Sequence, residues 1–370
     1  MRIAVLVAIL SLMPALLFGQ APPSFPDFSG WDIIDRGGRS MPYLNRPSLY
    51  LERGIALSPA TPLADGTIEF DVAIHGHNGF AGVVFRGVSP DDYELIYLRT
   101  HRSRQWDALQ YTPIFAGQEA WQLYTGAGYN AVAELPSNRW VHVRLVVDGL
   151  TASVFVDDAT TPQLIVSDLK RPWSRGRVGL WGRSGAANFS NFKVTAVDRP
   201  APSAASVAAP ADGVIAKWSL SQSFVASRID RNRIAPSAVW APVIAEQSGL
   251  VNIAEHRRPV ARATTDPPDD GRDTVYARAV LRSSEAMRVR LAFGYSDDVV
   301  VFLDGKPLFS GSAGYLSRDG SYLGSVTLGP DALFLELGAG RHELVFAVSE
   351  AFGGWGVIAR LEGARNVAIE

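Results

Sequence analysis

The sequence predicts an all-β protein with two β-sandwich (jelly-roll) domains in tandem after a signal peptide. Three observations support this fold class. Many short segments alternate hydrophobic and polar residues, turn-forming dipeptides separate them, and a stretch rich in Ala, Pro and Ser divides the chain. No segment shows a sustained helical period. The length of 370 residues suggests about two domains, and the 47% hydrophobic content is enough for ordinary cores.

The first 21 residues have the features of a secretory signal peptide. Arg2 precedes an apolar run from Ile3 to Phe18, and the small residues Gly19 and Ala21 mark the expected cleavage region. A membrane anchor is the alternative, but the run is shorter than the ~20 apolar residues that a span needs. No later stretch could span a bilayer. We therefore expect a periplasmic or extracellular protein without a membrane span. Because the chain has no cysteine, core burial alone must stabilise it.

Residues 22–198 contain a series of expected strands that form the first sandwich. In residues 67–74, Ile68, Phe70 and Val72 alternate with Glu69 and Asp71, so one face of this strand is buried. The other expected strands have similar patterns and occupy residues 80–88, 93–101, 140–149, 151–158, 176–182 and 188–197.

Residues 199–212 have no core pattern and are expected to be a linker. A second series of strands follows in residues 213–370. Within it, Asp304 and Gly305 supply the positive φ angles of a tight hairpin turn. Pro307 cannot donate a ladder hydrogen bond, so the returning strand is expected at a sheet edge.

Two resemblances to known families follow from these patterns. The series FAGVVFRG, DDYELIYLRTH, RWVHVRLVVDG and GRVGLWG resembles a concanavalin A-like lectin/glucanase domain of the laminin-G-like or keto-disaccharide-hydrolase-like type, over residues 28–197. The segments DDVVVFLDGKPLF, LELGAGRHELVFAVSE and FGGWGVIARLE are similar to the galactose-binding-like jelly rolls, over residues 213–363. The first resemblance implies a fold that hosts lectins, hydrolases and structural modules alike.

Residues 93–110 hold the strongest functional pattern. One face of the expected strand combines Tyr97, Arg99 and His101, and this mixture is unusual for an ordinary solvent face. Aromatic rings stack on the apolar faces of sugars, while Asp, Gln and Arg bond sugar hydroxyls. The alternative is that several aromatic residues, notably Trp140 and Trp181, fill the core or its rim. The candidate glycan-binding residues are Arg86, Tyr97, Arg99, His101, Asp107, Gln110, Tyr111, Trp121 and Tyr124.

The sequence contains no complete catalytic signature, so the catalytic residues are unknown. Laminarinase-type members of the first family carry Glu-x-Asp-x-x-Glu, in which two Glu act as nucleophile and acid. This chain has Glu69 and Asp71, but the third position is Ile74. We therefore expect Glu69 and Asp71 to lie on the solvent face of a strand. A glycoside hydrolase or lyase is the alternative function, and its candidate residues are Glu94, His101, Asp107 and Tyr111.

No metal site or cofactor is predicted. His75 and His77 could share a face, but no third ligand is evident. Asp297 and Asp298 are expected to form a turn, with calcium binding as the alternative. A further, weaker binding candidate is a set of residues near strand ends of the second domain: Tyr315, Arg318, Asp319, Tyr322, Glu350 and Trp355.

The net charge of −2 gives no basic field, so nucleic acid is not an expected partner. Within this balance, Arg99, His101, Arg102 and Arg104 cluster in six residues. The cluster predicts a preference for acidic glycans, such as uronate-containing chains. The alternative is that nearby acids, namely Asp91, Asp92, Glu94 and Asp107, neutralise these cations.

The sequence thus predicts an exported carbohydrate-binding protein that recognises a polysaccharide or oligosaccharide, possibly an acidic one, in a groove of the first sandwich. The other two functions left open are an enzyme acting on a polysaccharide and a structural protein of the cell envelope.

Overall fold

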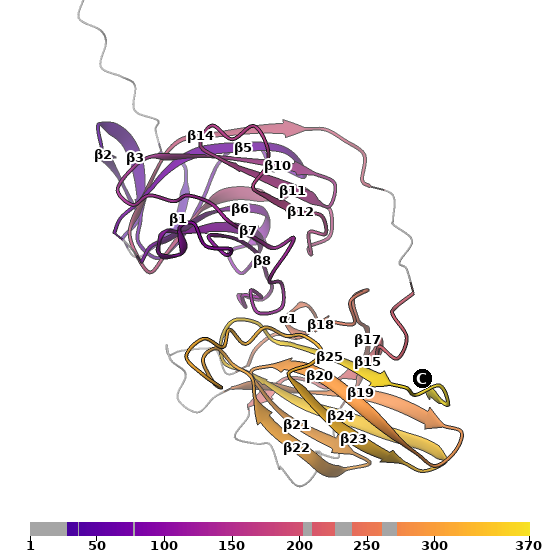
Figure 1. Ribbon diagram of the computed structural model, residues 1–370. Coiled ribbons are helices and arrows are strands. Elements are labelled where there is room, and N and C mark those ends of the chain that lie inside the picture. Colours follow the sequence, from indigo (N-terminus) through magenta and orange to yellow (C-terminus); the bar gives the residue numbers. More distant parts are fainter. Residues whose placement is uncertain (1–27, 36, 77, 203–208, 226–238, 261–271) are drawn as a thin grey trace, which may run out of the picture.

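The computed structural model describes residues 28–202, 209–225, 239–260 and 272–370, except residues 36 and 77. The predicted signal peptide and residues 203–208 of the predicted linker lie outside these ranges. The predicted fold class is confirmed, because the described chain is almost entirely β and forms two sandwiches in tandem (Figure 1). Strand β14 is the last strand of the first sandwich, and β15 is the first strand of the second.

The first sandwich consists of two seven-stranded antiparallel sheets. One sheet has the order β1-β4-β13-β6-β7-β8-β9, and the other β12-β11-β10-β5-β14-β3-β2. The strands of the first sheet are β1 (Asp32–Asp35), β4 (Gly54–Leu57), β13 (Arg177–Arg183), β6 (Phe80–Ser89), β7 (Asp92–Arg99), β8 (Leu109–Ile114) and β9 (Asn130–Ala131). Those of the second are β12 (Leu164–Val166), β11 (Thr151–Val156), β10 (Val141–Asp148), β5 (Asp65–Ile74), β14 (Ala187–Val197), β3 (Arg46–Leu51) and β2 (Arg39–Tyr43).

The core of the first sandwich lies between these sheets, and Phe70, Phe85 and Phe189 are fully buried there. Strand β7 differs from an ordinary amphipathic strand because both of its faces are buried. Its inner face packs in the core, whereas Tyr97 of its outer face packs in a second cluster with Trp181. In Figure 1, the sheet that contains β6, β7 and β8 lies on the side of the first sandwich nearer the second.

The second sandwich also has two antiparallel sheets. The larger has the order β17-β15-β19-β24-β21-β22, and β16 and β26 also pair with β19; the smaller has the order β18-β25-β20-β23. The larger contains β15 (Lys217–Leu220), β16 (Phe224–Val225), β17 (Ala241–Ile244), β19 (Asp273–Ser283), β21 (Asp298–Leu303), β22 (Lys306–Ser312), β24 (Gly340–Glu350) and β26 (Val367–Ile369). The smaller contains β18 (Val251–Asn252), β20 (Met287–Ser296), β23 (Asp331–Leu337) and β25 (Gly356–Glu362). Within the described ranges, the helical elements are the short 3₁₀ helix η1 (Thr100–Arg102) and α1 (Ile253–His256).

The predicted hairpin of the second sandwich is confirmed. Asp304 and Gly305 connect β21 to β22 with φ angles of 50° and 76°. Strand β22, which contains Pro307, forms one edge of the larger sheet. The missing donor of Pro307 therefore leaves no gap in an inner ladder.

A loop of the first sandwich joins it to the second. We call residues 118–125 the bridging loop. Its Ala120, Leu123 and Tyr124 are buried in one cluster with Leu250, Val326 and Ile358 of the second sandwich. Burial of this apolar cluster holds the two sandwiches against each other, beside the outer face of β7.

Candidate functional site

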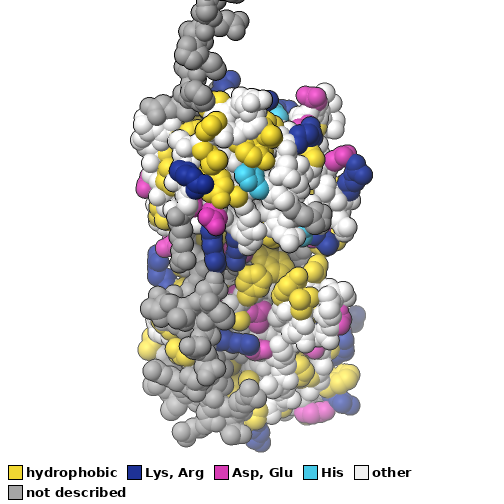
Figure 2. Space-filling model, turned by 90° about the vertical axis from the view of Figure 1, so that its left-hand side faces the viewer, with side chains coloured by type: hydrophobic (Ala, Val, Ile, Leu, Met, Phe, Trp, Pro, Cys, Tyr) yellow, Lys and Arg dark blue, Asp and Glu magenta, His cyan; other side chains and the backbone are white. Residues whose placement is uncertain are grey.

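A pocket opens between the outer face of the first sandwich and the second sandwich. Its volume is about 330 Å³, which is near the lower end of the range for small-ligand pockets. Strands and loops of the first sandwich supply Phe80, Leu95, Tyr97, Arg99, His101, Arg102, Trp106, Asp107, Gln110, Trp181, Arg183 and Ser184. The bridging loop supplies Glu119, Trp121 and Thr125, and the second sandwich supplies Tyr315, Leu323 and Phe352. On the face shown in Figure 2, hydrophobic side chains gather on the first sandwich and at its junction with the second.

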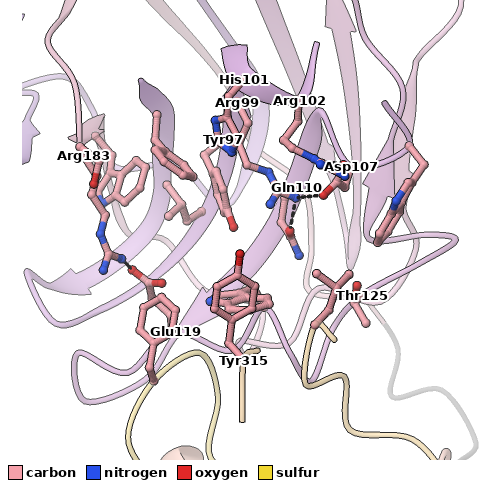
Figure 3. A pocket seen from close by; sticks show the side chains of 18 residues that line it. Tyr97, Arg99, His101, Arg102, Asp107, Gln110, Glu119, Thr125, Arg183 and Tyr315 are labelled. Atoms are coloured by element: carbon pink, nitrogen blue, oxygen red, sulfur yellow. Dashed lines mark hydrogen bonds and ion pairs between the residues drawn. The ribbon is translucent and has the colours of Figure 1, made fainter. Parts of the chain in front are cut away.

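One side of the pocket is a hydrogen-bonded polar cluster around Asp107 (Figure 3). The Arg99 guanidinium donates to Gln110 Oε1 at 2.7 Å and lies 3.3 Å from Asp107 Oδ2. Arg102 Nε donates to Asp107 Oδ1 at 2.8 Å. Because the Asp107 side chain is largely buried, two guanidinium groups compensate the cost of removing its charge from water.

The local fold explains why these residues meet. Arg99 ends β7, η1 turns the chain through Arg102, and β8 returns with Gln110. In the β7–β8 register Gln110 lies opposite Tyr97, so both side chains are on the outer face. Asp107 lies in the turn between the two strands.

A second polar pair lies at the other side of the pocket. Arg183, the last residue of β13, forms an ion pair with Glu119 of the bridging loop. The same guanidinium lies 5.8 Å from the ring centroid of Phe352. Figure 3 shows this pair across the pocket from the Asp107 cluster.

Aromatic side chains line the space between the two polar groups. On the first sandwich, the Tyr97 ring centroid is 5.5 Å from that of Trp181 and 6.1 Å from that of Phe80. Burial raises the pKa of the Tyr97 hydroxyl well above its usual value, so this group stays protonated and can donate. In Figure 3, the Tyr97 and Tyr315 side chains point toward one another across the pocket.

Six of the nine predicted glycan-binding residues line this pocket: Tyr97, Arg99, His101, Asp107, Gln110 and Trp121. His101 was expected on the same extended strand as Tyr97, but β7 ends at Arg99 and His101 lies in η1. His101 still lines the pocket, where its ring centroid lies 4.9 Å from that of Phe80.

Arg86 was predicted to bind the ligand, but its side chain is fully buried away from the pocket. The guanidinium donates to the carbonyl oxygens of Ala64 and Gly149 and pairs with Asp65. The physical reason is a register shift between Phe85 and Ser89, where Arg86 has a φ of 49°. This irregularity breaks the alternation that would otherwise place Arg86, the neighbour of the inward-facing Phe85, on the outer face.

Tyr111 and Tyr124 were also predicted to bind the ligand and are buried outside the pocket. Tyr111 lies opposite Ile96 and therefore shares the inner face of the sheet. Its hydroxyl donates to Glu94 Oε2 at 2.7 Å. Tyr124 lies in the bridging loop, and its hydroxyl donates to Glu246 of the second sandwich.

The four residues considered for catalysis do not lie together. Glu94 and Tyr111 lie inside the first sandwich, whereas His101 and Asp107 line the pocket. Asp71 lies on the face of β5 opposite the core residues Phe70 and Val72, as expected, but other side chains cover it. Its carboxylate is largely buried, accepting from Arg46 at 2.6 Å and contacting His142 Nδ1 at 2.7 Å.

Several pocket residues were not predicted as ligand contacts. Arg183 follows Trp181 by two positions on β13, so strand alternation alone could have placed it on the same face. Leu323 and Phe352 belong to the second sandwich, and no local pattern indicates that they approach the first. Tyr315 was among the weaker candidates of the second domain. Of the others, Trp355 is fully buried in the core, and Arg318 pairs with Asp331.

The arginines of the positive cluster predicted around Arg99 all contact carboxylates in the structure, but Arg99 and Arg102 share one carboxylate, so their charge is only partly compensated. Arg99 and Arg102 pair with Asp107, and Arg104 pairs with Glu134. The alternative interpretation is borne out for Asp107, whereas Arg104 pairs with Glu134, which that interpretation did not include.

In the described part of the chain, no group of three or more His, Asp or Glu side chains is arranged to hold a metal ion. His77 lies outside the described residues. At the predicted turn, Asp297 accepts backbone hydrogen bonds from Ala351 and Phe352, and Asp298 pairs with Arg272. Within the same described ranges, no helix is long and apolar enough to cross a membrane.

Comparisons with known proteins gave similarities only among solved structures. No protein-family model matches the sequence, and no curated protein matches it. A carbohydrate-binding module of Bacillus subtilis, CBM66, is 18% identical, with a TM-score of 0.34, over 44% of this chain and 93% of that one. A Bacillus subtilis protein of unknown function with a galectin-like fold is 14% identical, with a TM-score of 0.34, over 45% and 89%. A galectin of Caenorhabditis elegans is 13% identical, with a TM-score of 0.29, over 44% and 99%.

Proposed function

We propose that this chain is an exported carbohydrate-binding protein that holds a saccharide in the pocket between its two sandwiches. The observation that carries the proposal is the fixed polar cluster of Asp107, Arg99 and Gln110 beside the aromatic pair Tyr97 and Trp181. A sugar presents hydroxyls at its edge and C–H groups on its faces. Carboxylate, guanidinium and amide groups match the hydroxyls, and aromatic rings match the faces.

The polar groups of the pocket are suited to binding rather than to hydrolysis. A retaining or inverting glycosidase needs one carboxylic acid that donates a proton to the leaving group. Here Asp107 is paired with two arginines, and Glu119 is paired with Arg183. In both pairs the carboxylate oxygens are the acceptors and the guanidinium groups the donors, so neither side chain is the donor that this step needs.

The ion pairs also favour an uncharged saccharide over an acidic one. Three arginines and two carboxylates line the pocket, which leaves a formal charge of +1 with His101 uncharged. Each of these arginines already contacts a carboxylate. A uronate would have to compete with Asp107 or Glu119 for its guanidinium partner, whereas a hydroxyl can bond to either member of a pair.

The test is an array of neutral and uronate-containing oligosaccharides probed with the mature protein, followed by titration calorimetry and a reducing-end release assay. We expect binding to neutral members, little dependence on salt and no release of reducing ends. Binding only to acidic members, lost as salt rises, would contradict the preference for uncharged sugars. Release of reducing ends would favour an enzyme, and binding to no member would favour a structural role.

Arg99→Ala and Arg104→Ala form a matched pair for this assay. Both arginines pair with a carboxylate, but Arg99 lines the pocket, whereas Arg104 pairs with Glu134 on the exposed surface. Loss of a charge-assisted hydrogen bond costs roughly 1.5–3 kcal/mol, or about ten- to a hundredfold in affinity. We expect that loss for Arg99→Ala and none for Arg104→Ala, with both variants folded by circular dichroism. Equal affinities of the two variants would mean that the saccharide binds outside this pocket.

A further inference from the structure

The second sandwich brings two large aromatic side chains to the pocket. Tyr315 and Phe352 line it, and they remain 46% and 44% exposed. Their ring centroids are 5.7 and 5.8 Å from that of Trp121 in the bridging loop, with near edge-on geometry. The three rings form a patch that we call the aromatic wall. In Figure 3, Tyr315 approaches the pocket from the side opposite Tyr97.

The aromatic wall is not the part of the interface that holds the sandwiches together. That part is the buried cluster in which Leu123 and Tyr124 pack against residues of the second sandwich. Side chains that serve only to seal an interface are expected to be buried in it. Tyr315 and Phe352 instead leave nearly half of their surface uncovered and present it to the cavity.

Hydrogen bonds fix the wall relative to the first sandwich. Gln122 of the bridging loop is fully buried, and its backbone N–H donates to the carbonyl of Gly353 at 3.0 Å. Its carbonyl accepts from the N–H of Val326 at 2.9 Å, and its side chain donates to the Leu323 carbonyl at 3.3 Å. Both loops that carry the aromatic residues of the second sandwich are therefore bonded to one residue of the first.

The second sandwich fixes the same loop from its own side. The Asp297 carboxylate accepts from the N–H groups of Ala351 and Phe352, both at 2.8 Å. Gly353 then adopts a φ of 100°, and a Cβ there would lie 2.4 Å from Gln122 Oε1. A glycine is thus required where the loop meets the bridging loop. Phe352 is held at the pocket by contacts from both sandwiches.

We propose that the second sandwich is part of the binding site, and that Tyr315 and Phe352 stack on the bound saccharide from the side opposite Tyr97. This inference rests on the proposed function, since it assigns a role within the same pocket. The two sides of the pocket come from different sandwiches, so a bound saccharide contacts both of them and stabilises their arrangement.

The experiment compares full-length variants on the same array of neutral and uronate-containing oligosaccharides. Tyr315→Ala and Phe352→Ala each remove one ring of the wall. Phe334→Ala is the matched control, because Phe334 is 53% exposed, lies on β23 and is not among the residues that line the pocket. We expect the two wall variants to weaken binding about tenfold or more, as for an aromatic residue at the centre of an interface. Phe334→Ala should bind as the unaltered protein does.

The outcomes separate this inference from the proposed function. If Arg99→Ala weakens binding but both wall variants bind as the unaltered protein does, the saccharide site belongs to the first sandwich alone and the inference is wrong. If the unaltered protein binds no oligosaccharide on the array, the proposed function fails and the inference fails with it. Circular dichroism and thermal unfolding of each variant exclude misfolding as the cause of a loss.

Discussion

Replacing Lys170 tests how firmly the two sandwiches are joined. Lys170 lies in the loop after β12, and only 12% of its side chain is exposed. Its Nζ atom is 2.6 Å from Glu246 Oε2 of the second sandwich and 2.8 Å from Asp168 Oδ2 of the first. It also lies 4.8 Å from the ring centroid of Tyr124. Lys170→Met keeps most of the apolar stem and removes the ammonium group with its charge and hydrogen bonds.

The expected cost follows from the exposure of each partner. Glu246 is 25% exposed, so its charge-assisted bond contributes roughly 1.5–3 kcal/mol. Asp168 is 52% exposed, and a pair of that kind contributes less than about 1 kcal/mol. The cation–π contact with Tyr124 adds about 0.5–1 kcal/mol. Lys170→Met should therefore lower the free energy of unfolding by about 2–5 kcal/mol.

Urea unfolding followed by tryptophan fluorescence measures this loss, with the free energy extrapolated to water. Lys193→Met is the matched control, because Lys193 is 69% exposed and lies 3.7 Å from Glu69. Its loss should stay below about 0.5 kcal/mol. Equal stability of the two variants would refute the reasoning, because it would mean that Lys170 contributes no more than a surface ion pair does.

The effect of Lys170 should also depend on pH in one direction. Burial lowers the pKa of Lys170, but the neighbouring charges of Glu246 and Asp168 outweigh burial and raise it above its usual value. A group whose pKa is raised by folding contributes fully below its unfolded pKa, about 10.4 for lysine, and less as pH rises through its folded pKa. The difference between Lys170→Met and the unaltered protein should therefore shrink only at strongly alkaline pH.

Two further predictions concern the interior and the modular organisation. Burial raises the pKa of Glu94 above its usual value. The protonated side chain therefore contributes its full stabilisation below about pH 4.5, the usual value. This stabilisation is lost as pH rises through the folded pKa, at up to about 1.4 kcal/mol per pH unit. In urea unfolding from acid to neutral pH, Glu94→Gln should lose less stability than the unaltered protein, and an identical pH profile would show that Glu94 does not titrate in this range. The fragments 22–198 and 213–370 should each fold cooperatively when expressed alone, but with a lower melting temperature than the intact chain, because each exposes its half of the buried cluster around Leu123. Circular dichroism during heating measures this, and a fragment without a cooperative transition would show that the proposed boundary is wrong.

Much of the first sandwich could be predicted because strand alternation is a local property. The mixed face of β7 is an example, since Tyr97 lies on the outer face and Ile96 on the inner face, as period two requires. The same rule would have excluded Tyr111, which neighbours the outer-facing Gln110 and must therefore point inward. Tyr111 and its neighbour Gln110 were both predicted as ligand contacts, which treated consecutive residues of one strand as if they shared a face.

The other errors arose where the period is interrupted or where distant segments meet. The register shift beside Arg86 turns that side chain into the interior, and a single sequence does not mark such a bulge. The role of Tyr124 depends on Glu246, which is 122 residues away along the chain. Contacts of this kind are set by the packing of two sandwiches, so no local pattern contains them.

The geometry of the pocket explains why its two sides are tied to one residue. Stacking on a sugar requires rings held at a fixed separation, and this separation would change if one sandwich moved relative to the other. Gln122 limits that movement because its backbone and side chain bond to loops on which Leu323 and Phe352 lie. Burial of the Gln122 amide away from water is compensated only while these bonds are intact. The polar contacts of the bridging loop therefore stabilise the relative arrangement of the sandwiches that the proposed site needs.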